Sequence, residues 1–493
     1  MGAEISAASA ARLAAVPAVV RHVHLIGVAG TAMAALAGML AERGLRVTGS
    51  DDQLYEPTAS LLERLRVEVR RGFGPGNLEP APDLVVVGNV VPRANPEAQA
   101  LLEGRIPYLS MPEALWHFFL RDRRVLMVAG THGKTTSTAM MAHVLACAGR
   151  DPSMLVGGVA LDFNSNYRLG HGPDFVIEGD EYDTAFFDKG PKFLHYRPHG
   201  AIITSVEFDH ADIYRDLEHV KSSFRALADQ LAMETHVIAV SADFPAALEV
   251  TEAAPARRIT FGLNGGEFRA IDIAIGSDGA RFSIARGEKR VADEMRLPIG
   301  GRMNVANALG VFVLLREFGL AAREIAPGLA SFRGVARRQE VVGEAGAVTV
   351  IDDFAHHPTA IRATLEAVAE RWAGKRILAA FEPRSNTSRR SVFQAEFATA
   401  FDRAARVYLA PVYFKENDPI PAGERLATDV LARAISARGP RAAACESIDA
   451  ILAASLNDAR AGDVVVVMSN GPFDNLKERL LAALCERGQQ PSP

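Results

Sequence analysis

The sequence has few cysteines, no excess of basic residues and no long apolar run. Its three cysteines, Cys147, Cys445 and Cys485, are too few and too scattered for a disulfide framework or a zinc site. Lys and Arg total 54 against 59 Asp and Glu, so the net charge of −5 gives no electrostatic footprint for nucleic acid. The chain lacks a stretch of about eighteen apolar residues, which predicts no membrane insertion. We therefore expect a cytoplasmic protein.

The first twenty residues are rich in Ala and Val but lack the pattern of a signal peptide. Glu4 precedes any basic residue, and Arg12 interrupts the apolar run. A strand-like segment follows directly at residue 22. The pattern favours a flexible leader over residues 1–21.

Short apolar runs alternate with helix-length periodic stretches along the chain, a pattern typical of α/β folds with parallel sheets. The first series predicts strands over 22–26 and 46–51 and a helix over about 31–43. A later strand is predicted over 201–210. The stretch 241–300 is polar, contains regularly placed glycines and predicts a small β-rich excursion.

Charge clusters at 121–124 and 332–340 separate three such series, and the length also suggests about three domains. The predicted fold is α/β. It has a Rossmann-like N-terminal domain over 22–122, a central P-loop ATPase-type domain over 123–335 and a Rossmann-like C-terminal domain over 336–493.

The strongest motif is VAGTHGKTT at 128–136, where an apolar strand enters a glycine turn and then a helix. This arrangement directs backbone N–H groups and the positive end of the helix dipole at one point, which suits a phosphate. Lys134 is expected to reach the β- and γ-phosphates of ATP, and the Thr135 hydroxyl to bind Mg²⁺. The alternative is a strand-to-helix turn that merely needs glycine. The predicted ATP-binding residues of the loop are Gly130, Thr131, His132, Gly133, Lys134, Thr135 and Thr136.

Two acidic segments, IEGDEYD at 177–183 and EFDHAD at 207–212, follow later strands. Because the carboxyl ends of parallel strands meet at one edge of a sheet, we expect both segments to face the P-loop. Mg²⁺ binds carboxylate and phosphate oxygens, and a neutral imidazole can also serve. Taken singly, each of these side chains could be a surface charge. The predicted metal ligands are Thr135, Glu178, Glu181 and His210, with Asp209 beside them.

The N-terminal turn GVAGTA at 27–32 resembles a dinucleotide fingerprint with Ala29 in place of the second glycine. Ser50, Asp51 and Asp52 follow about twenty residues later, where a ribose-binding acid usually lies. Nicotinamide binding is one interpretation. The same geometry can hold any nucleotide diphosphate, including UDP, or be an ordinary strand–turn–helix.

Further polar clusters follow in the last third of the chain. DDFAHHP at 352–358 and FEPRSNT at 381–387 both end apolar strands, which suggests a lined crevice, although a capped helix also explains the first. In RMNVANA at 302–308, Asn304 and Asn307 share one helical face, where they could contact a base or lie in solvent.

These motifs, in this order, resemble the Mur ligase family, which adds amino acids or peptides to UDP-N-acetylmuramic acid, from about residue 22 to 480. GTHGKTT is similar to the family's ATP loop, EGDEYD and EFDHAD to its metal-binding segments, and DDFAHHPTAI to the start of its third domain. RMNVAN resembles its adenine-side helix, with Met303 where the family usually has His. The resemblance implies a catalytic set of Lys134, Glu178, His210, His357 and Arg384, adenine contacts from Asn304 and Asn307, and UDP-sugar contacts from Gly27, Gly30, Thr31, Ser50, Asp51 and Asn89.

Within the family, the strings DEYDTAFFDK, EFDHADIY, EPRSNT and VMSNGPFDNL resemble the branch that uses the tripeptide L-alanyl-γ-D-glutamyl-meso-diaminopimelate. The resemblance implies ATP- and Mg²⁺-dependent ligation to UDP-N-acetylmuramate through an acyl-phosphate, in peptidoglycan recycling. The alternatives are ligation of L-alanine, a regulatory P-loop NTPase and a nicotinamide oxidoreductase. Folylpolyglutamate synthases share the chemistry, but the UDP-type N-terminal domain argues against them.

Overall fold

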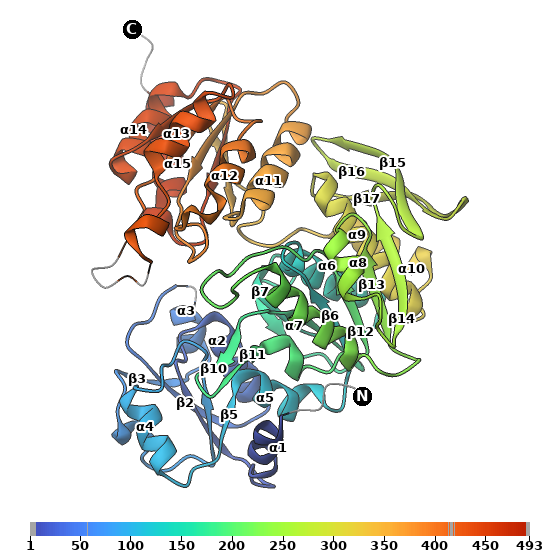
Figure 1. Cartoon of the computed structure of the whole chain (residues 1–493), viewed down its shortest axis with the longest axis vertical. Coiled ribbons are helices and arrows are strands. Elements are labelled where there is room, and N and C mark those ends of the chain that lie inside the picture. The colour runs from blue at the N-terminus through green and yellow to red at the C-terminus, as the bar shows by residue number, and fades with distance from the viewer. Residues whose placement is uncertain (1–5, 57, 413, 415–417, 419, 490–493) are drawn as a thin grey trace. The chain divides into compact units, whose positions relative to one another are not determined.

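The computed structural model describes residues 6–56, 58–412, 414, 418 and 420–489, and they form two compact units (Figure 1). The first unit comprises Met1–Glu207, Leu217–Phe268 and Gly310–Gly328, and the second Phe208–Asp216, Arg269–Leu309 and Leu329–Pro493. Within the described ranges, no helix is long and apolar enough to cross a membrane.

The first unit begins with a five-stranded sheet of order β3-β2-β1-β4-β5, in which every pairing is parallel. Its strands are β1 (His22–Ile26), β2 (Arg46–Asp51), β3 (Glu68–Arg71), β4 (Leu84–Val87) and β5 (Tyr108–Ser110). Its helices are α2 (Thr31–Glu42), α3 (Thr58–Arg64), α4 (Pro96–Glu103) and α5 (Met111–Leu115), followed by η2 (Trp116–Leu120). The predicted strands over 22–26 and 46–51 and the predicted helix are confirmed.

Residues 7–14 differ from the predicted flexible leader. They form the helix α1 (Ala7–Ala14), capped by the Ser6 side chain. Arg12 lies 2.6 Å from Glu113 of α5, and the Ser9 hydroxyl donates to the same carboxylate. The prediction is wrong for this segment because the buried acid that holds it lies about a hundred residues further along the chain.

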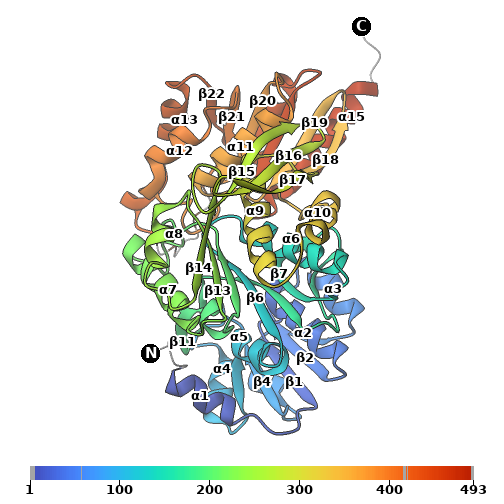
Figure 2. The same ribbon diagram turned by 90° about the vertical axis from the view of Figure 1, so that its right-hand side faces the viewer.

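The second sheet of this unit has the order β14-β13-β12-β6-β9-β7-β8 (Figure 2). All its pairings are parallel except that of β8 with β7. β12 is shorter than predicted because residues after Ile203 turn toward the glycine loop that follows β6. The strands are β6 (Arg124–Ala129), β7 (Ser153–Ala160), β8 (Ser165–Arg168), β9 (Asp174–Gly179), β12 (Gly200–Ile203), β13 (Val237–Ser241) and β14 (Arg257–Gly262). The helices α6 (Lys134–Cys147), α7 (Leu217–Gln230) and α8 (Pro245–Val250) and the hairpin β10 (Asp183–Ala185) and β11 (Asp188–Pro191), with η3 (Lys192–His195), complete it.

The two sheets of the first unit are joined through a close contact of α2 with β8. A Cβ on Gly38 would overlap the Tyr167 hydroxyl, so only glycine leaves room for this ring. The Tyr167 hydroxyl then donates to Glu42 at 2.9 Å. The contact fixes the N-terminal sheet against the sheet that carries the glycine loop.

The second unit contains the predicted β-rich excursion and a six-stranded sheet. The excursion is β15 (Phe268–Gly276), β16 (Gly279–Arg286) and β17 (Lys289–Leu297). The helices α9 (Arg302–Glu317) and α10 (Ala322–Ser331) follow in the chain, and Gly310–Gly328, which covers the later part of α9 and most of α10, belongs to the first unit. The sheet has the order β18-β19-β23-β20-β21-β22, with only β18 antiparallel among the described pairings. Its strands are β18 (Glu340–Ala345), β19 (Val348–Asp353), β20 (Ile377–Phe381), β21 (Arg406–Leu409), β22 (Arg441–Ala444) and β23 (Val464–Met468).

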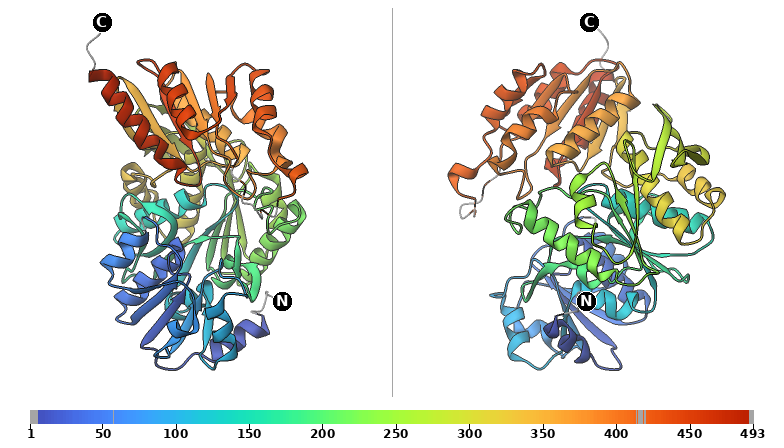
Figure 3. Two further views of the ribbon diagram at one scale, coloured as in Figure 1. Left: turned by 90° about the vertical axis from the view of Figure 1, so that its left-hand side faces the viewer. Right: turned by 45° about the vertical axis from the view of Figure 1, so that its right-hand side comes forward.

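Helices cover both faces of this sheet (Figure 3). One apolar core includes side chains of α11 (Pro358–Arg371), α12 (Gln394–Ala400) and α13 (Thr428–Ser436), and the other includes those of α14 (Ile448–Asp458) and α15 (Leu476–Gln489). Burial on both faces explains the nearly continuous apolar runs of β20 and β23. The predicted α/β fold is confirmed.

Candidate active site

The glycine loop between β6 and α6 has the predicted strand–turn–helix geometry. Gly130 has a φ of +135°, and a Cβ there would overlap the Thr204 hydroxyl. Gly133, with a φ of +80°, is the N-cap of α6. Both positions therefore require glycine, and the loop delivers the first turn of α6 directly after a buried strand.

Residues that follow β12 hold this loop in place. The N–H of Thr131 donates to the Ser205 carbonyl and the N–H of His132 to the Ser205 hydroxyl, both at 2.9 Å. The Glu207 carboxylate lies 2.7 Å from His132 Nε2, and the backbone N–H of Glu207 donates to the Thr131 hydroxyl at 2.8 Å. The backbone N–H groups of Thr131 and His132, two residues predicted to bind ATP, are thus used to hold the loop in its conformation. Sequence reasoning missed Ser205, because only the fold brings it beside the loop.

Lys134 starts α6 and points back over the loop. Its ammonium donates to the carbonyl of Gly130 at 2.6 Å and to Glu181 at 2.8 Å. The side chain is 13% exposed. Burial by itself would lower the pKa of Lys134, but the carboxylates of Glu181 and Glu178 outweigh burial and raise it. The lysine is therefore held charged at the mouth of the loop.

Thr135 and Glu178 form a neighbouring pair of oxygen ligands. The Thr135 hydroxyl donates to Glu178 Oε1 at 2.9 Å, and the N–H of Gly157 donates to Glu178 Oε2 at 2.7 Å. A Cβ on Gly157 would come within 3.0 Å of that carboxylate, so glycine allows the close approach. Glu178 thus stands beside the hydroxyl predicted to bind Mg²⁺, whereas Glu181 stands beside the lysine.

Asp180, between these two acids, anchors the turn that carries them. It lies 2.6 Å from the Lys192 ammonium and accepts the N–H of Tyr182 at 3.1 Å. Burial would raise its pKa, but Lys192 outweighs burial and lowers the pKa of Asp180 to about 2. The sequence did not predict this pair, because the spacing of twelve residues matches no local pairing rule.

The second unit gathers three other predicted segments. His357 Nε2 lies 3.2 Å from the Phe208 carbonyl, and the Asn386 amide donates to Asp212 at 2.8 Å. The N–H of Ala211 donates to the Thr387 hydroxyl at 3.2 Å. The loops after β19 and β20 therefore both contact the segment 208–212, which includes Asp209 and His210.

His357 acts as a helix cap, the alternative given for its motif. Its Nδ1 accepts the N–H of Thr359 at 3.3 Å, so it is the N-cap of α11. With Nε2 beside the Phe208 carbonyl, both ring nitrogens have structural partners and the side chain is buried. The geometry does not support its predicted catalytic role, because capping uses the lone pair that a base would need. The neighbouring His356 lies 3.9 Å from Asp209.

His210 and Arg384 are placed differently from His357. His210 has a φ of +54°, in the left-handed region, and its N–H donates to its neighbour Asp209 at 2.7 Å. The Arg384 side chain is 49% exposed and lies 3.3 Å from Glu382. Its guanidinium is therefore accessible to a ligand.

Asn304 and Asn307 are both buried, rather than in solvent. The Asn304 amide donates to the Gly300 carbonyl at 2.7 Å, and the Asn307 amide to Asn304 at 3.3 Å. The Gln339 amide lies 3.9 Å from the sulfur of Met303. These bonds fix the start of α9.

The N-terminal glycine turn lies at the carboxyl edge of the first sheet, next to the strand-order reversal between β1 and β4. The N–H groups of Gly27 and Val28 donate to the Ser50 carbonyl at 2.9 and 3.1 Å. Gly30 is the N-cap of α2 and has no side-chain cap bond within the described residues, while Thr31 is exposed. Asn89, half-buried, follows β4 at the same edge.

Two residues predicted to contact the UDP-sugar are engaged inside the domain. Ser50 is fully buried, and its hydroxyl donates to Glu97 at 2.9 Å. The Asp51 carboxylate accepts the N–H groups of Ala29 and Asp52, both at 2.9 Å. The prediction of a ligand contact is wrong for the Ser50 side chain, and Asp51 ties the glycine turn. The sequence motif could not distinguish a ligand-binding acid from one that holds the loop.

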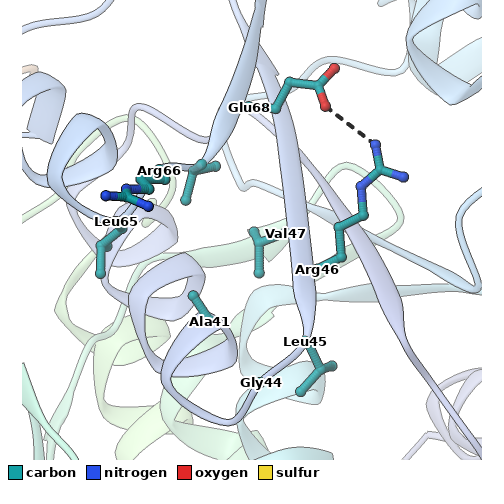
Figure 4. Close-up of a pocket in the computed structure, with 9 residues that line it drawn as sticks. Ala41, Gly44, Leu45, Arg46, Val47, Leu65, Arg66 and Glu68 are labelled. Atoms are coloured by element: carbon teal, nitrogen blue, oxygen red, sulfur yellow. Dashed lines mark hydrogen bonds and ion pairs between the residues drawn. The ribbon is translucent and has the colours of Figure 1, made fainter.

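The pocket in Figure 4, of about 510 Å³, lies elsewhere on the first unit. It is lined by residues at the end of α2 and the amino ends of β2 and β3, with Arg46 and Glu68 paired at 3.3 Å. Ligands of such sheets bind at the carboxyl edge. The predicted site residues lie outside this pocket.

Three family models match successive parts of the chain. They are the Mur ligase family, catalytic domain over residues 22–123, the Mur ligase middle domain over 128–315, and the Mur ligase, glutamate ligase domain over 337–471.

Relatives of known function match nearly the whole chain. It is 36% identical over 469 residues to the UDP-N-acetylmuramate–L-alanyl-γ-D-glutamyl-meso-2,6-diaminoheptandioate ligase of Escherichia coli, covering 95% of this chain and 99% of that protein. It is 37% identical over 459 residues to a UDP-N-acetylmuramate–L-alanine ligase of Rubrobacter xylanophilus, covering 92% and 95%. A crystal structure of a murein peptide ligase from Psychrobacter arcticus matches with a TM-score of 0.70 at 32% identity, covering 96% and 100%. The chain therefore belongs to the Mur ligase family, whose members are ATP-dependent enzymes that form amide bonds.

Proposed function

We propose that this ligase joins the carboxylate of UDP-N-acetylmuramate to the amine of L-alanyl-γ-D-glutamyl-meso-diaminopimelate, in the cytoplasm, as a step of peptidoglycan recycling. The observation that carries the proposal is the 36% identity to the Escherichia coli enzyme of that specificity over 99% of its length. The strings DEYDTAFFDK and EPRSNT, which resemble the same branch, support it. The family matches also support domain bounds near 22–122, 123–335 and 336–493.

We infer that the glycine loop and α6 hold the ATP phosphates. The N–H groups in the first turn of a helix lack partners within the helix, and the dipole favours an anion there. The Lys134 ammonium, which contacts the carbonyls of Gly130 and Thr131 at 2.6 and 3.3 Å, lies at the same place and would turn to the phosphates. On the adenine side, Asn304 and Asn307 are assigned by family resemblance alone.

Thr135 and Glu178 are the residues that would hold Mg²⁺. Their oxygen atoms lie 2.9 Å apart and are the hard ligands that this ion prefers, so the donor set fits. Bound there, Mg²⁺ would neutralise charge on the phosphates. Glu181 has a different task in this proposal, because its 2.8 Å contact keeps the Lys134 ammonium charged and aimed at the loop. His210 remains a proposed further ligand.

The chemistry follows from the need for a leaving group. A carboxylate cannot acylate an amine in water, because oxide would have to leave. Transfer of the γ-phosphoryl group from ATP makes that oxygen part of a phosphate, and the amine then displaces it through a tetrahedral intermediate. Lys134 offsets the charge that develops during phosphoryl transfer. Holding the reacting groups in line supplies much of the remaining acceleration.

We assign the UDP-sugar to the carboxyl edge of the first sheet and the incoming tripeptide to the C-terminal domain. Nucleotides bind such sheets at the switch point of the strand order. This point is flanked by the glycine turn around Gly27 and Gly30, by the exposed Thr31 and by the half-buried Asn89. The half-exposed Arg384 would bind a carboxylate of the tripeptide, since a guanidinium can make two parallel hydrogen bonds to it.

The second candidate is ligation of L-alanine. The 37% identity to the Rubrobacter xylanophilus enzyme is similar to the 36% identity to the Escherichia coli enzyme, so overall identity does not separate the two functions. Only the choice of amine substrate separates the two functions.

The test is phosphate release from ATP with UDP-N-acetylmuramate and either the tripeptide or L-alanine, with mass spectrometry of the product. We expect phosphate release and a UDP-linked tripeptide with the first amine. Turnover with L-alanine alone would establish the second candidate, and ATP hydrolysis that needs no UDP-sugar would overturn both.

A further inference from the structure

Glu97 is a fully buried carboxylate in the first turn of α4. Its Oε1 accepts the Ser50 hydroxyl at 2.9 Å and lies 2.7 Å from His24 Nε2. Its Oε2 accepts the Asn77 amide at 2.7 Å and the N–H of Gly74 at 3.3 Å. Burial would raise the pKa of Glu97, but the hydrogen bonds from His24 and Asn77 outweigh burial and lower it. The carboxylate is charged and has partners for both oxygens.

These partners come from separate segments of the first domain. His24 is in the middle of β1 and Ser50 is the last residue but one of β2, while Gly74 directly precedes, and Asn77 belongs to, the 3₁₀ helix η1 (Pro75–Leu78) that follows β3. All these strands are parallel, so their carboxyl ends share the edge assigned to the UDP-sugar. The N–H of Gly72 donates to the Asp51 carbonyl at 3.0 Å, and the Asn77 amide also donates to the Gly72 carbonyl at 2.9 Å. Asn77 is therefore the side chain that links Glu97 to the loop 72–77, beside the backbone N–H of Gly74.

The N-termini of α2 and α4, the two helices that start at the switch point, differ in charge because of Glu97. The first turn of α4 contains Glu97, and the Asn95 side chain accepts the N–H groups of Glu97 and Ala98 at 3.0 and 3.1 Å. The positive end of this helix thus already has its anion. By contrast, α2 has neither a side-chain cap nor an acid in its first turn, as far as the described residues show.

We propose that Glu97 is a positioning residue for the UDP-sugar site. Its charge occupies the start of α4, which leaves the start of α2 for the diphosphate, and through Asn77 it fixes the loop 72–77 as a wall of that site. The inference rests on the proposed function, because it assumes a UDP-sugar at this edge.

The experiment removes the side-chain link of Asn77 while leaving the buried acid in place. Asn77→Ala in the full chain should raise KM for UDP-N-acetylmuramate about tenfold, with kcat and KM for ATP within about twofold, because the wall is displaced and the chemistry is not. Calorimetric titration with UDP alone should show about the same loss of affinity. Glu97→Gln should give at least the same rise in KM. Both oxygens of Glu97 accept hydrogen bonds, so the NH2 group of the glutamine would face donors whichever way the amide turns.

The matched control is Asp83→Ala at the amino edge of the same sheet, where Asp83 accepts the N–H groups of Arg21 and His22 at 2.7 and 2.9 Å. It should lower Tm without changing KM for the UDP-sugar. The inference is overturned if Asn77→Ala matches this control in KM, or if it raises KM for ATP equally. Failure of the wild type to bind UDP or use a UDP-sugar would instead overturn the proposed function itself.

Discussion

Two glycine turns of the first unit have the same local design but different surroundings. Residues 27–30 join β1 to α2, and residues 130–133 join β6 to α6. In both, a glycine N-cap without a side-chain cap bond, in the part of the chain that the structure describes, opens the helix. Lys134 follows the second turn, whereas exposed Thr31 follows the first.

The acids beside the two turns differ as well. Glu178 contacts the side chain of Thr135, and Glu181 contacts that of Lys134. The Asp51 carboxylate instead accepts hydrogen bonds from backbone N–H groups. The second turn therefore has charged side chains beside it, which suit the triphosphate and metal ion proposed above, and the first has a backbone frame that suits the proposed diphosphate. The comparison teaches that two glycine turns of the same local design differ through the side chains that neighbouring segments place beside them.

Lys134→Ala, at the second turn, should have the largest effect on activity. We expect turnover to fall more than about a hundredfold with Tm nearly unchanged, because the variant removes a charge that acts in phosphoryl transfer. Thr31→Ala, in the first turn, should raise only KM for the UDP-sugar, by about threefold. Phosphate-release kinetics measure both, with Lys221→Ala on α7 as the control. Ligation by Lys134→Ala above about 1% of wild type would contradict the role of this loop.

The two acids of the second turn should separate under a Mg²⁺ titration. Glu178→Gln should raise the Mg²⁺ concentration for half-maximal rate and lower kcat by at least about tenfold, because a direct ligand loses its charge. Glu181→Gln should lower kcat with a smaller change in Mg²⁺ dependence, since it contacts Lys134. His210→Ala should resemble Glu178→Gln if it is a ligand. The control is Glu249→Gln, at an exposed position. If the dependence of rate on Mg²⁺ is as unchanged in all three variants as in this control, the metal site does not include these residues.

The Arg384 side chain is 49% exposed, whereas that of Lys134 is only 13% exposed. Arg384→Lys should raise KM for the tripeptide at least about tenfold, because lysine cannot make the bidentate contact. KM for ATP and the UDP-sugar should stay nearly unchanged. Steady-state kinetics with Arg433→Lys as control test this, and an equal rise in all three KM values would contradict substrate binding by Arg384.

Asp180 should have the smallest effect, on stability rather than on rate. Its folded pKa of about 2 is below the ordinary value of 3.8, so its stabilisation is present above about pH 4 and is lost as pH falls toward 2. Because the side chain is 40% exposed, water screens the pair with Lys192, and we expect less than about 1 kcal/mol. Urea unfolding of Asp180→Asn at pH 7 and pH 3 should show a smaller deficit at pH 3 than at pH 7. A deficit of equal size at both pH values would contradict an origin in this charge.

Much of the fold and of the ATP loop could be predicted from the sequence, because their signals are local. Apolar runs separated by helical periodicity predict parallel strands, and the glycines of GTHGKTT mark the turn that Gly130 and Gly133 require. The prediction of a β-rich excursion over 241–300 is confirmed for 268–297, since alternation within a strand is visible in its own residues, whereas 245–250 form the helix α8 and 257–262 a parallel strand of the central sheet. The sequence by itself determined these elements and their order.

Only the tertiary structure decided what each polar residue contacts. Ser50 and Glu97 are 47 positions apart and Ser205 reaches back to His132 across 73, so no spacing rule predicts either hydrogen bond. His357 caps a helix although its motif equally suggests chemistry. The physical reason is that hydrogen bonds and desolvation act between neighbours in space, and those neighbours are fixed only when the strands pair and their carboxyl ends meet.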